Sequence, residues 1–451
     1  MTDKAGSKPQ SGVTMIPGPR GQALTIDLDE VLSEPIDWRL KAWPPSAKTV
    51  SVAKAPDQKW NVLDGDFNLP VLVLKQSALQ HNIALMASYC AKNHLSLAPH
   101  VKTPVAPQIV RLQLEAGAWG VTVANFHELR LLRHLGVRLI LMANELLEPG
   151  PLAWVAREMA RDPSFEFFCL VDSERGIELM ETHLAAAGFK GKVSVMVEMG
   201  VAGGRCGCRT VDEALQVAER VIRSPCLQLA GVEAYEGMVQ AQTTDGKLPL
   251  VDALMHELRR FVERLDQAGR LAGLPEFLVT AGGSLFVDRV AELLGGEWNL
   301  SVPVRVVARC GAYVAHDMAD NEDASPLAGR SVGGDHLQQA LELWAVVLSR
   351  PETDLAVVGF GKRDVAHDRG WPKAFAVRSS GAWRSTGEAE LSVLSLNDQH
   401  ARVKVDSRST LGVGDQVGFH ISHPCTTFDN WRLVPNVDDA YNVVEAVRCY
   451  L

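Results

Sequence analysis

Residues 95–124 read LSLAPHVKTPVAPQIVRLQLEAGAWGVTVA. Two short apolar runs, LSLAPHVK at 95–102 and WGVTVA at 119–124, flank a segment that begins with Thr103 and Pro104. Threonine is a good N-cap and proline is favoured in the first helical turn, so these two residues are expected to open a helix. An apolar strand, a helix and a second apolar strand in this order predict a parallel sheet with crossover helices.

The same alternation continues on both sides of this segment. Helical spacing of apolar residues recurs, for example, in SALQHNIALMASYCAKN at 77–93 and TVDEALQVAERVIR at 210–223. The apolar runs lie at 71–74, 95–102, 119–124, 138–143, 165–171, 192–199, 227–235, 277–283 and 303–309. These are nine runs, whereas a closed barrel needs eight strands. We therefore predict an α/β fold with a (β/α)8 barrel in residues 66–316, in which VLVL at 71–74 leads into the barrel. A doubly wound open sheet is the alternative.

The pattern changes after the predicted barrel. Segments such as LELWAVVLSR at 341–350 and AELSVLSLNDQHARVKV at 389–405 predict strands separated by turns, with little helical signal. Residues 317–451 are therefore expected to form a second, mainly antiparallel β domain. Residues 1–65 show no clear period and are expected to be an N-terminal extension that partly joins the β domain.

Composition excludes several classes of function. Hydrophobic residues make up 47% of the 451-residue chain, which favours a large globular core over disorder. The net charge of −9 provides no basic surface for nucleic acid. We expect no membrane span, since no apolar run reaches about 18 residues, and no signal peptide. Eight scattered cysteines predict reduced thiols and a cytoplasmic location.

Lys102 is the first candidate for chemistry, because it ends an apolar strand run. In a barrel this position lies at the C-terminal rim, where barrel active sites are built. Apolar neighbours such as Val101 and Pro99 help a lysine lose its charge and act as a nucleophile towards a carbonyl. Most lysines, however, are surface residues with a solvated head group.

Two glycine-rich loops at later strand ends are candidates for anion binding. Glycines let backbone N–H groups approach a phosphate, and ordinary turns are the alternative explanation. A third loop, Gly203–Cys208, places Arg205 at the rim, and its Cys206 and Cys208 lack a second pair of metal ligands. The candidates around a phosphate are Thr280, Gly282, Gly283, Gly311 and Tyr313.

His423 and Cys425 are the candidate metal ligands. They lie two residues apart in SHPCTTFDNW at 422–431, and on an extended segment they point to the same side. Imidazole and thiolate are good zinc ligands, and two protein ligands leave room for water or substrate. A buried histidine and cysteine in a turn is the structural alternative.

Together these segments resemble the D-serine dehydratase and D-threonine aldolase family, which is an alanine-racemase-like group of fold-type III enzymes that use pyridoxal 5′-phosphate (PLP). The resemblance extends from about Leu69 to Trp431. It rests on PHVKT at 99–103, GAWGVTVAN at 117–125, GGRCG at 203–207, GVEAYEG at 231–237, TAGGS at 280–284, GAYVAHD at 311–317, GFGKRD at 359–364 and HPCTTFDNW at 423–431.

The resemblance implies roles for the candidate residues. Lys102 carries PLP as a Schiff base, Arg205 contacts the 3-oxygen of the pyridine ring and Tyr235 faces the ring nitrogen. The residues around the phosphate are Thr280, Gly282, Gly283, Gly311 and Tyr313. His423 and Cys425 hold a divalent metal, with zinc expected. The resemblance also implies a head-to-tail homodimer.

The metal motif favours one branch of the family. HPCTTFD resembles the dehydratases, whereas the aldolases tend to carry a carboxylate as second ligand, and thiolate favours zinc. We therefore predict a lyase that converts a D-hydroxyamino acid, D-serine or D-threonine, to a 2-oxo acid and ammonia. The alternatives are a D-threonine aldolase that yields glycine and an aldehyde, a D-threo-3-hydroxyaspartate dehydratase, an amino-acid racemase, a non-catalytic PLP carrier, and a metal-stabilised binding module without PLP.

Overall fold

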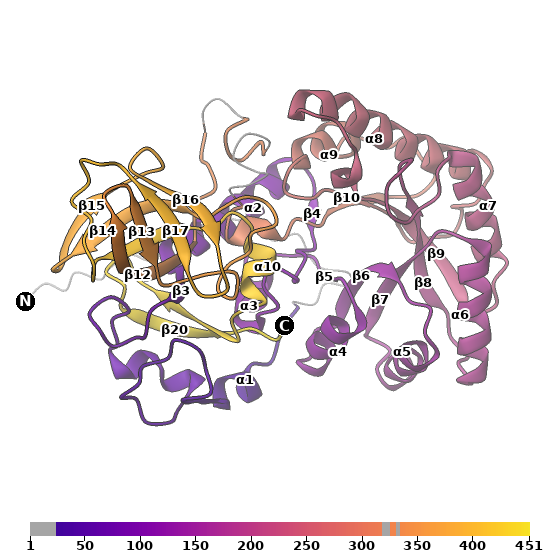
Figure 1. Ribbon diagram of the computed structural model, residues 1–451. Helices are drawn as coiled ribbons and strands as arrows, with labels where there is room; N and C mark the ends of the chain where they lie inside the picture. Colours follow the sequence, from indigo (N-terminus) through magenta and orange to yellow (C-terminus); the bar gives the residue numbers. More distant parts are fainter. Residues whose placement is uncertain (1–23, 318–324, 331–333) are drawn as a thin grey trace, which may run out of the picture.

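The computed structural model describes residues 24–317, 325–330 and 334–451 of the chain. Figure 1 shows two lobes, a ring of parallel strands surrounded by helices and a separate domain made mostly of strands. The first 23 residues of the predicted N-terminal extension lie outside the described part of the chain.

The first lobe is a nearly closed barrel of eight parallel strands, as predicted. Its strands follow one another around the ring in the order β4-β11-β10-β9-β8-β7-β6-β5. The N–H of Val101 donates to the carbonyl of Thr122 at 2.9 Å, which joins the β4 and β5 edges and excludes the open doubly wound sheet. The strands are β4 (Ser96–Leu97), β5 (Val121–Val123), β6 (Leu139–Glu145), β7 (Glu166–Val171), β8 (Val193–Met199), β9 (Leu227–Ala234), β10 (Phe277–Ala281) and β11 (Val304–Ala308).

Helices cover the outer face of the barrel strands, and side chains inside the ring cover the inner face. Inside the ring, large side chains such as Trp119, Phe168 and Met196 form a separate apolar cluster, so the barrel is filled rather than hollow. The helices are α2 (Gln76–Lys92), α3 (Pro107–Glu115), α4 (Phe126–His134), α5 (Pro149–Arg161), α6 (Glu174–Ala186), α7 (Val211–Ile222), α8 (Thr244–Gln267) and α9 (Val287–Leu294).

The apolar run at residues 71–74 belongs to the β domain. Strand β3 (Val71–Lys75) pairs antiparallel with β12 (Leu341–Glu352) and parallel with β19 (Leu433–Val437). This corrects the predicted domain boundary, which placed residues 71–74 in the barrel domain of residues 66–316. All five β3 residues are buried, and a short apolar run buried on both faces has the same sequence pattern in either kind of sheet. Its removal leaves the eight strands that a barrel requires.

The second domain is a ten-stranded, mainly antiparallel sheet, as predicted. Of its ladders in the described residues, only β3 with β19 is parallel. Its remaining strands are β13 (Leu355–Val358), β14 (Lys373–Ser379), β15 (Ala382–Ser385), β16 (Leu391–Leu396), β17 (Ala401–Val405), β18 (Gln416–His420) and β20 (Val443–Arg448). The short helix α10 (Pro424–Phe428) lies between the two lobes (Figure 1).

Residues 24–65 contact both domains. Helix α1 (Asp29–Ser33) packs Val31 against Leu135, which follows barrel helix α4. Further along, Trp43 meets Trp60 and Phe67 edge-on, with ring centroids 4.8 and 5.6 Å away. These rings join an apolar cluster that includes β3, β12, β19 and β20 of the β domain. The short strands β1 (Pro35–Ile36) and β2 (Val50–Ser51) form a hairpin beside them.

Among the described residues, no helix is both long and apolar enough to cross a membrane. All eight cysteines lie in the described part of the chain and are free.

Replacement of Trp43 by alanine should destabilise the protein by about 3–5 kcal/mol, because it leaves a cavity among the rings of Trp60 and Phe67. Urea denaturation followed by near-UV circular dichroism measures this loss. Trp38→Ala is the matched control, since the Trp38 side chain is 89% exposed. Equal midpoints for the two variants would show that the aromatic cluster does not stabilise the β domain.

Candidate functional site

A cavity of about 880 Å3 lies where the C-terminal ends of the barrel strands face the β domain. Parallel strands all end at the same rim, so residues distant in sequence meet there. The cavity brings together eight of the ten predicted site residues. These are Lys102, Arg205, Tyr235, Gly282, Gly283, Gly311, His423 and Cys425.

Lys102 lies just beyond β4, with its side chain in the open cavity. Desolvation by the cavity walls lowers the pKa of Lys102; the nearby Cys425 opposes this shift, and Arg205 and Arg309 add to it. Burial lowers the pKa of the neighbouring His100 well below its usual value, with contributions from Lys102 and Arg309, so His100 stays neutral. A lysine with a lowered pKa is the kind of amine that forms Schiff bases.

Thr103 has a different role from the expected N-cap. Helix α3 begins only at Pro107, with Ala106 as its N-cap residue. The Thr103 hydroxyl instead donates a hydrogen bond to Cys425 Sγ at 2.8 Å, across 322 residues of sequence. N-cap signals describe local sequence only, so they did not reveal this contact with the β domain.

Arg205 and Tyr235 meet in the lining of the same cavity. The Arg205 guanidinium carbon lies 5.0 Å from the centroid of the Tyr235 ring, a cation–π distance. Burial raises the pKa of Tyr235, assisted by Glu236, so its hydroxyl keeps its proton at neutral pH. A flat aromatic cofactor has a cation and a phenol available on this side.

At the end of the cavity where the phosphate is predicted to bind, the N–H groups of Gly282 and Gly283 are already hydrogen-bonded within the protein. They donate to the two carboxylate oxygens of buried Glu236, at 3.0 and 2.6 Å. Gly282 has a φ of +98°, which favours glycine. Ser284 and Ala312 line the same end of the cavity and offer further backbone groups.

The remaining candidate residues for phosphate binding mainly pack against other residues of the protein. A side chain at Gly311 would lie 2.5 Å from the His100 carbonyl oxygen, so close packing requires glycine there. Thr280 is fully buried and its hydroxyl donates to Val307, and Tyr313 receives a hydrogen bond from Gln113 at 3.0 Å. Neither Thr280 nor Tyr313 lines the cavity. The sequence could not show this, because positions of a βα turn that face inward and outward have the same sequence pattern.

A buried ion pair forms the floor of the cavity. Arg309 contacts Glu233 through its guanidinium, and both side chains are almost fully buried. Arg309 also donates to the Thr280 hydroxyl at 3.0 Å and the Ala234 carbonyl at 2.9 Å. Such a pair holds both charges rigidly at the strand ends.

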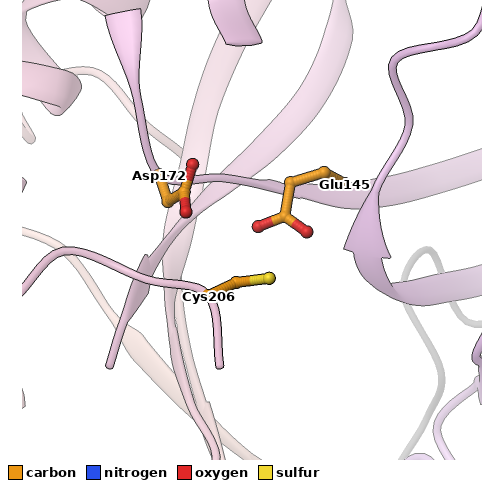
Figure 2. A group of neighbouring side chains, drawn as sticks. All are labelled: Glu145, Asp172 and Cys206. Atoms are coloured by element: carbon orange, nitrogen blue, oxygen red, sulfur yellow. The ribbon is translucent and has the colours of Figure 1, made fainter. Parts of the chain in front are cut away.

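Three more side chains lie close together at the Gly203–Cys208 loop, to which Cys206 itself belongs. Figure 2 shows Glu145, Asp172 and Cys206 pointing towards one another, with ligand atoms within 4.8 Å. Asp172 accepts the N–H of Gly207 at 3.0 Å, which fixes the loop. Burial, then the Glu233 charge and a hydrogen bond with Glu145, raises the pKa of the adjacent Glu198 to about 9. Glu198 therefore stays protonated at neutral pH, which limits repulsion among these acids.

The predicted metal ligands lie at the start of α10. His423 immediately precedes the helix and Cys425 is in its first turn, so the segment is not extended as expected, yet the two side chains still meet. His423 Nδ1 hydrogen-bonds Asp368 at 2.9 Å. Burial alone lowers the pKa of His423, but hydrogen bonds with Cys425 and Asp368 outweigh it and raise that pKa to about 9. Adjacent nitrogen and sulfur donors suit zinc.

Sequence reasoning missed several residues that shape this site. A charged residue at the end of a strand run was an available signal for Arg309, which follows β11 in VVARC, and for Glu233, which lies near the end of β9 in GVEAY. For Asp368 no local signal existed, since it lies 55 residues from His423. The missed residues are His100, Thr103, Glu233, Glu236, Arg309 and Asp368.

The two lobes match two described protein domains. The alanine racemase N-terminal domain matches residues 74–284, and the putative serine dehydratase domain matches residues 340–437. The first match covers most of the barrel. The second covers much of the β domain and includes the His423–Cys425 segment.

Curated relatives are similar over most of their length. D-threonine aldolase from Arthrobacter sp is 25% identical over 75% of this chain and 80% of its own. D-threo-3-hydroxyaspartate dehydratase from Delftia sp. (strain HT23) is 26% identical over 67% of this chain and 73% of its own. The relatives thus include enzymes of both kinds, aldolase and dehydratase.

Solved structures agree on the fold. D-threonine aldolase from Filomicrobium marinum has a TM-score of 0.68, with 24% identity over 85% of this chain and 95% of that one. A cysteine-to-alanine mutant of D-threo-3-hydroxyaspartate dehydratase in a metal-free form has a TM-score of 0.65, with 20% identity over 85% and 98%. The chain therefore joins an alanine racemase N-terminal domain to a putative serine dehydratase domain, and its fold is the alanine-racemase-like one.

Proposed function

We propose that the protein is a PLP- and zinc-dependent D-hydroxyamino acid dehydratase, which converts D-serine or D-threonine to a 2-oxo acid and ammonia. One observation carries the proposal. Lys102, a lysine with a lowered pKa, shares a cavity with the His423–Cys425 pair, and Thr103 links the two by its hydrogen bond to Cys425.

The cavity fits PLP. Lys102 can bind the aldehyde, Arg205 can contact the 3-oxygen and Tyr235 can lie at the ring nitrogen. The end lined by Gly283 and Gly311 can take the phosphate, with backbone groups of Ser284 and Ala312 beside it. Once bound, PLP supplies the electron sink that stabilises negative charge at Cα.

The His423–Cys425 pair fits zinc. Its two donors face the cavity and leave other coordination positions for water and the substrate hydroxyl. Bound zinc supplies a Lewis acid for the β-hydroxyl, which is a poor leaving group on its own.

Lys102 then acts as the general base. Its lowered pKa makes a neutral amine available, and that amine removes the proton from Cα of the substrate. Arg205 and the backbone groups of Ser284 and Ala312 can hold the anionic groups in place. Elimination of the β-hydroxyl as water, followed by hydrolysis of the C–N bond, gives the 2-oxo acid and ammonia.

A D-threonine aldolase is the second candidate, and the Arthrobacter relative favours it. It would cleave Cα–Cβ of the same substrates and release glycine and an aldehyde. The Delftia relative supports D-threo-3-hydroxyaspartate as another substrate for dehydration. Cys425, a thiolate ligand where a carboxylate is expected in aldolases, favours dehydration.

We also infer a homodimer in the cytoplasm. The free cysteines support a reducing compartment. The dimer is supported by the family resemblance.

Purified protein given PLP, Zn2+ and D-serine or D-threonine should form pyruvate or 2-oxobutanoate, and EDTA should abolish this product, because the hydroxyl then lacks its Lewis acid. One assay that quantifies 2-oxo acid, ammonia and glycine tests this. Added Zn2+ after EDTA is the control and should restore activity. Glycine as the main product would identify an aldolase instead.

Lys102→Ala should lower activity by about 10^2–10^4-fold or more, because it removes the general base. The visible absorbance of bound PLP should be lost as well. The measurement pairs absorption spectra with the product assay. The exposed Lys190 offers a matched control, since Lys190→Ala leaves the cavity unchanged. Full activity of Lys102→Ala would rule out the proposed role.

The rate of PLP loading should rise with pH to a midpoint below the usual lysine pKa of about 10.4, because only neutral Lys102 attacks the aldehyde. Arg205 lowers the pKa of Lys102, so Arg205→Met should move the midpoint upward. Stopped-flow absorbance of apoprotein mixed with PLP, across a pH series, measures both midpoints. A lower midpoint in Arg205→Met would contradict the electrostatic explanation.

A further inference from the structure

Each predicted metal ligand is held by a side chain from a distant part of the chain. His423 Nδ1 lies 2.9 and 3.0 Å from the two carboxylate oxygens of Asp368. Cys425 Sγ receives the Thr103 hydroxyl at 2.8 Å. Asp368 comes from the segment between β13 and β14, whereas Thr103 comes from the barrel rim. The two ligands are therefore held by residues of different domains.

We propose that Asp368 and Thr103 are positioning residues that aim His423 Nε2 and Cys425 Sγ at one metal ion. The inference rests on the proposed metal-dependent function. It identifies the two residues that set the position of the metal in that site. Neither residue is a metal ligand in this arrangement.

Asp368 determines which imidazole nitrogen is available. The Asp368 carboxylate accepts a proton held on Nδ1, so Nε2 is the nitrogen that would bind a metal. The Thr426 hydroxyl lies 3.1 Å from the same Nδ1 and 3.4 Å from Asp368, which further restricts rotation of the ring. Only 8% of His423 is exposed, so the ring is held on its other sides by packing.

Thr103 determines where the sulfur lies. The threonine is 2% exposed and belongs to the rigid rim of the barrel, so its hydroxyl is a fixed donor. A hydrogen bond from this donor to Cys425 Sγ restricts rotation about the cysteine χ1 angle. Loss of the hydroxyl frees the sulfur to turn away from His423.

Thr103 also follows Lys102 directly in the chain. The bond to Cys425 therefore fixes the metal pair relative to the lysine that removes the α-proton. Substrate hydroxyl and α-proton lie on neighbouring carbons, so the two protein groups must keep a constant separation for both to act on one molecule. Thr103 therefore connects Cys425 to Lys102, by its hydrogen bond on one side and by the peptide bond on the other.

The experiment uses the full-length holoenzyme. Zn2+ affinity is measured by competition with a chromophoric chelator, and Co2+ substitution reports thiolate ligation through its sulfur-to-cobalt absorption band. We expect Asp368→Asn and Thr103→Val to bind Zn2+ about 10–100-fold more weakly than the native protein. Thr103→Val should also weaken the cobalt band, and Thr103→Ser should restore both signals because it keeps the hydroxyl.

Two matched variants control for general effects. Asp398→Asn removes another exposed carboxylate in the β domain, and Thr122→Val removes a buried barrel hydroxyl that bonds the Ala98 carbonyl. Both should bind Zn2+ as the native protein does. The absorbance of bound PLP shows that each variant is folded.

The outcomes separate this inference from the proposed function. Native affinity and an unchanged cobalt band in both Asp368→Asn and Thr103→Val would overturn the positioning role and leave the metal-dependent function intact. Failure of the native protein to bind Zn2+ would overturn the metal-dependent function and the positioning role with it. Failure of Thr103→Ser to restore binding would overturn the role of the Thr103 hydroxyl.

Discussion

The hydrogen bond between Thr103 and Cys425 connects the barrel to the β domain, which are formed by different parts of the chain. A parallel barrel gathers its strand ends at one rim, but that rim alone provides no second wall. The β domain supplies this wall, and its position is set by β3, whose last residue Lys75 is followed immediately by the barrel helix α2. β3 is paired on both sides in one domain and is covalently continuous with the other, and α10 lies between the two lobes (Figure 1), where Cys425 lines the cavity.

Electrostatics constrains the same region. Arg205 and Arg309 bring positive charge to the rim, and buried cations there require partners. Glu233 pairs with Arg309 at the floor, while Glu236 accepts two glycine N–H groups. Arg205 is therefore a cation of the cavity lining that can contact an anionic cofactor directly.

The barrel and the β domain were predictable because their periodicity repeats over many elements, and Lys102 was predictable from its place at a strand end. The assignment of β3 was not, because a buried run of five apolar residues fits either sheet. Asp368 and Thr103 were missed for a related reason: their partners lie 55 and 322 residues away, and sequence patterns describe neighbours along the chain. Glu236 shows that a glycine-rich turn can bind an internal carboxylate.

The chemistry of the second metal ligand is the basis on which we propose dehydration rather than aldol cleavage. Cleavage of Cα–Cβ requires the substrate hydroxyl to lose its proton, so the metal must make that hydroxyl more acidic. Dehydration requires the same oxygen to leave with its proton. A thiolate donates more charge to zinc than a carboxylate does, and so acidifies a coordinated hydroxyl less. Cys425 therefore disfavours the alkoxide that the aldolase reaction needs. A metal held by His423 and Cys425 would still assist departure of the hydroxyl, which supports the proposed dehydration over aldol cleavage.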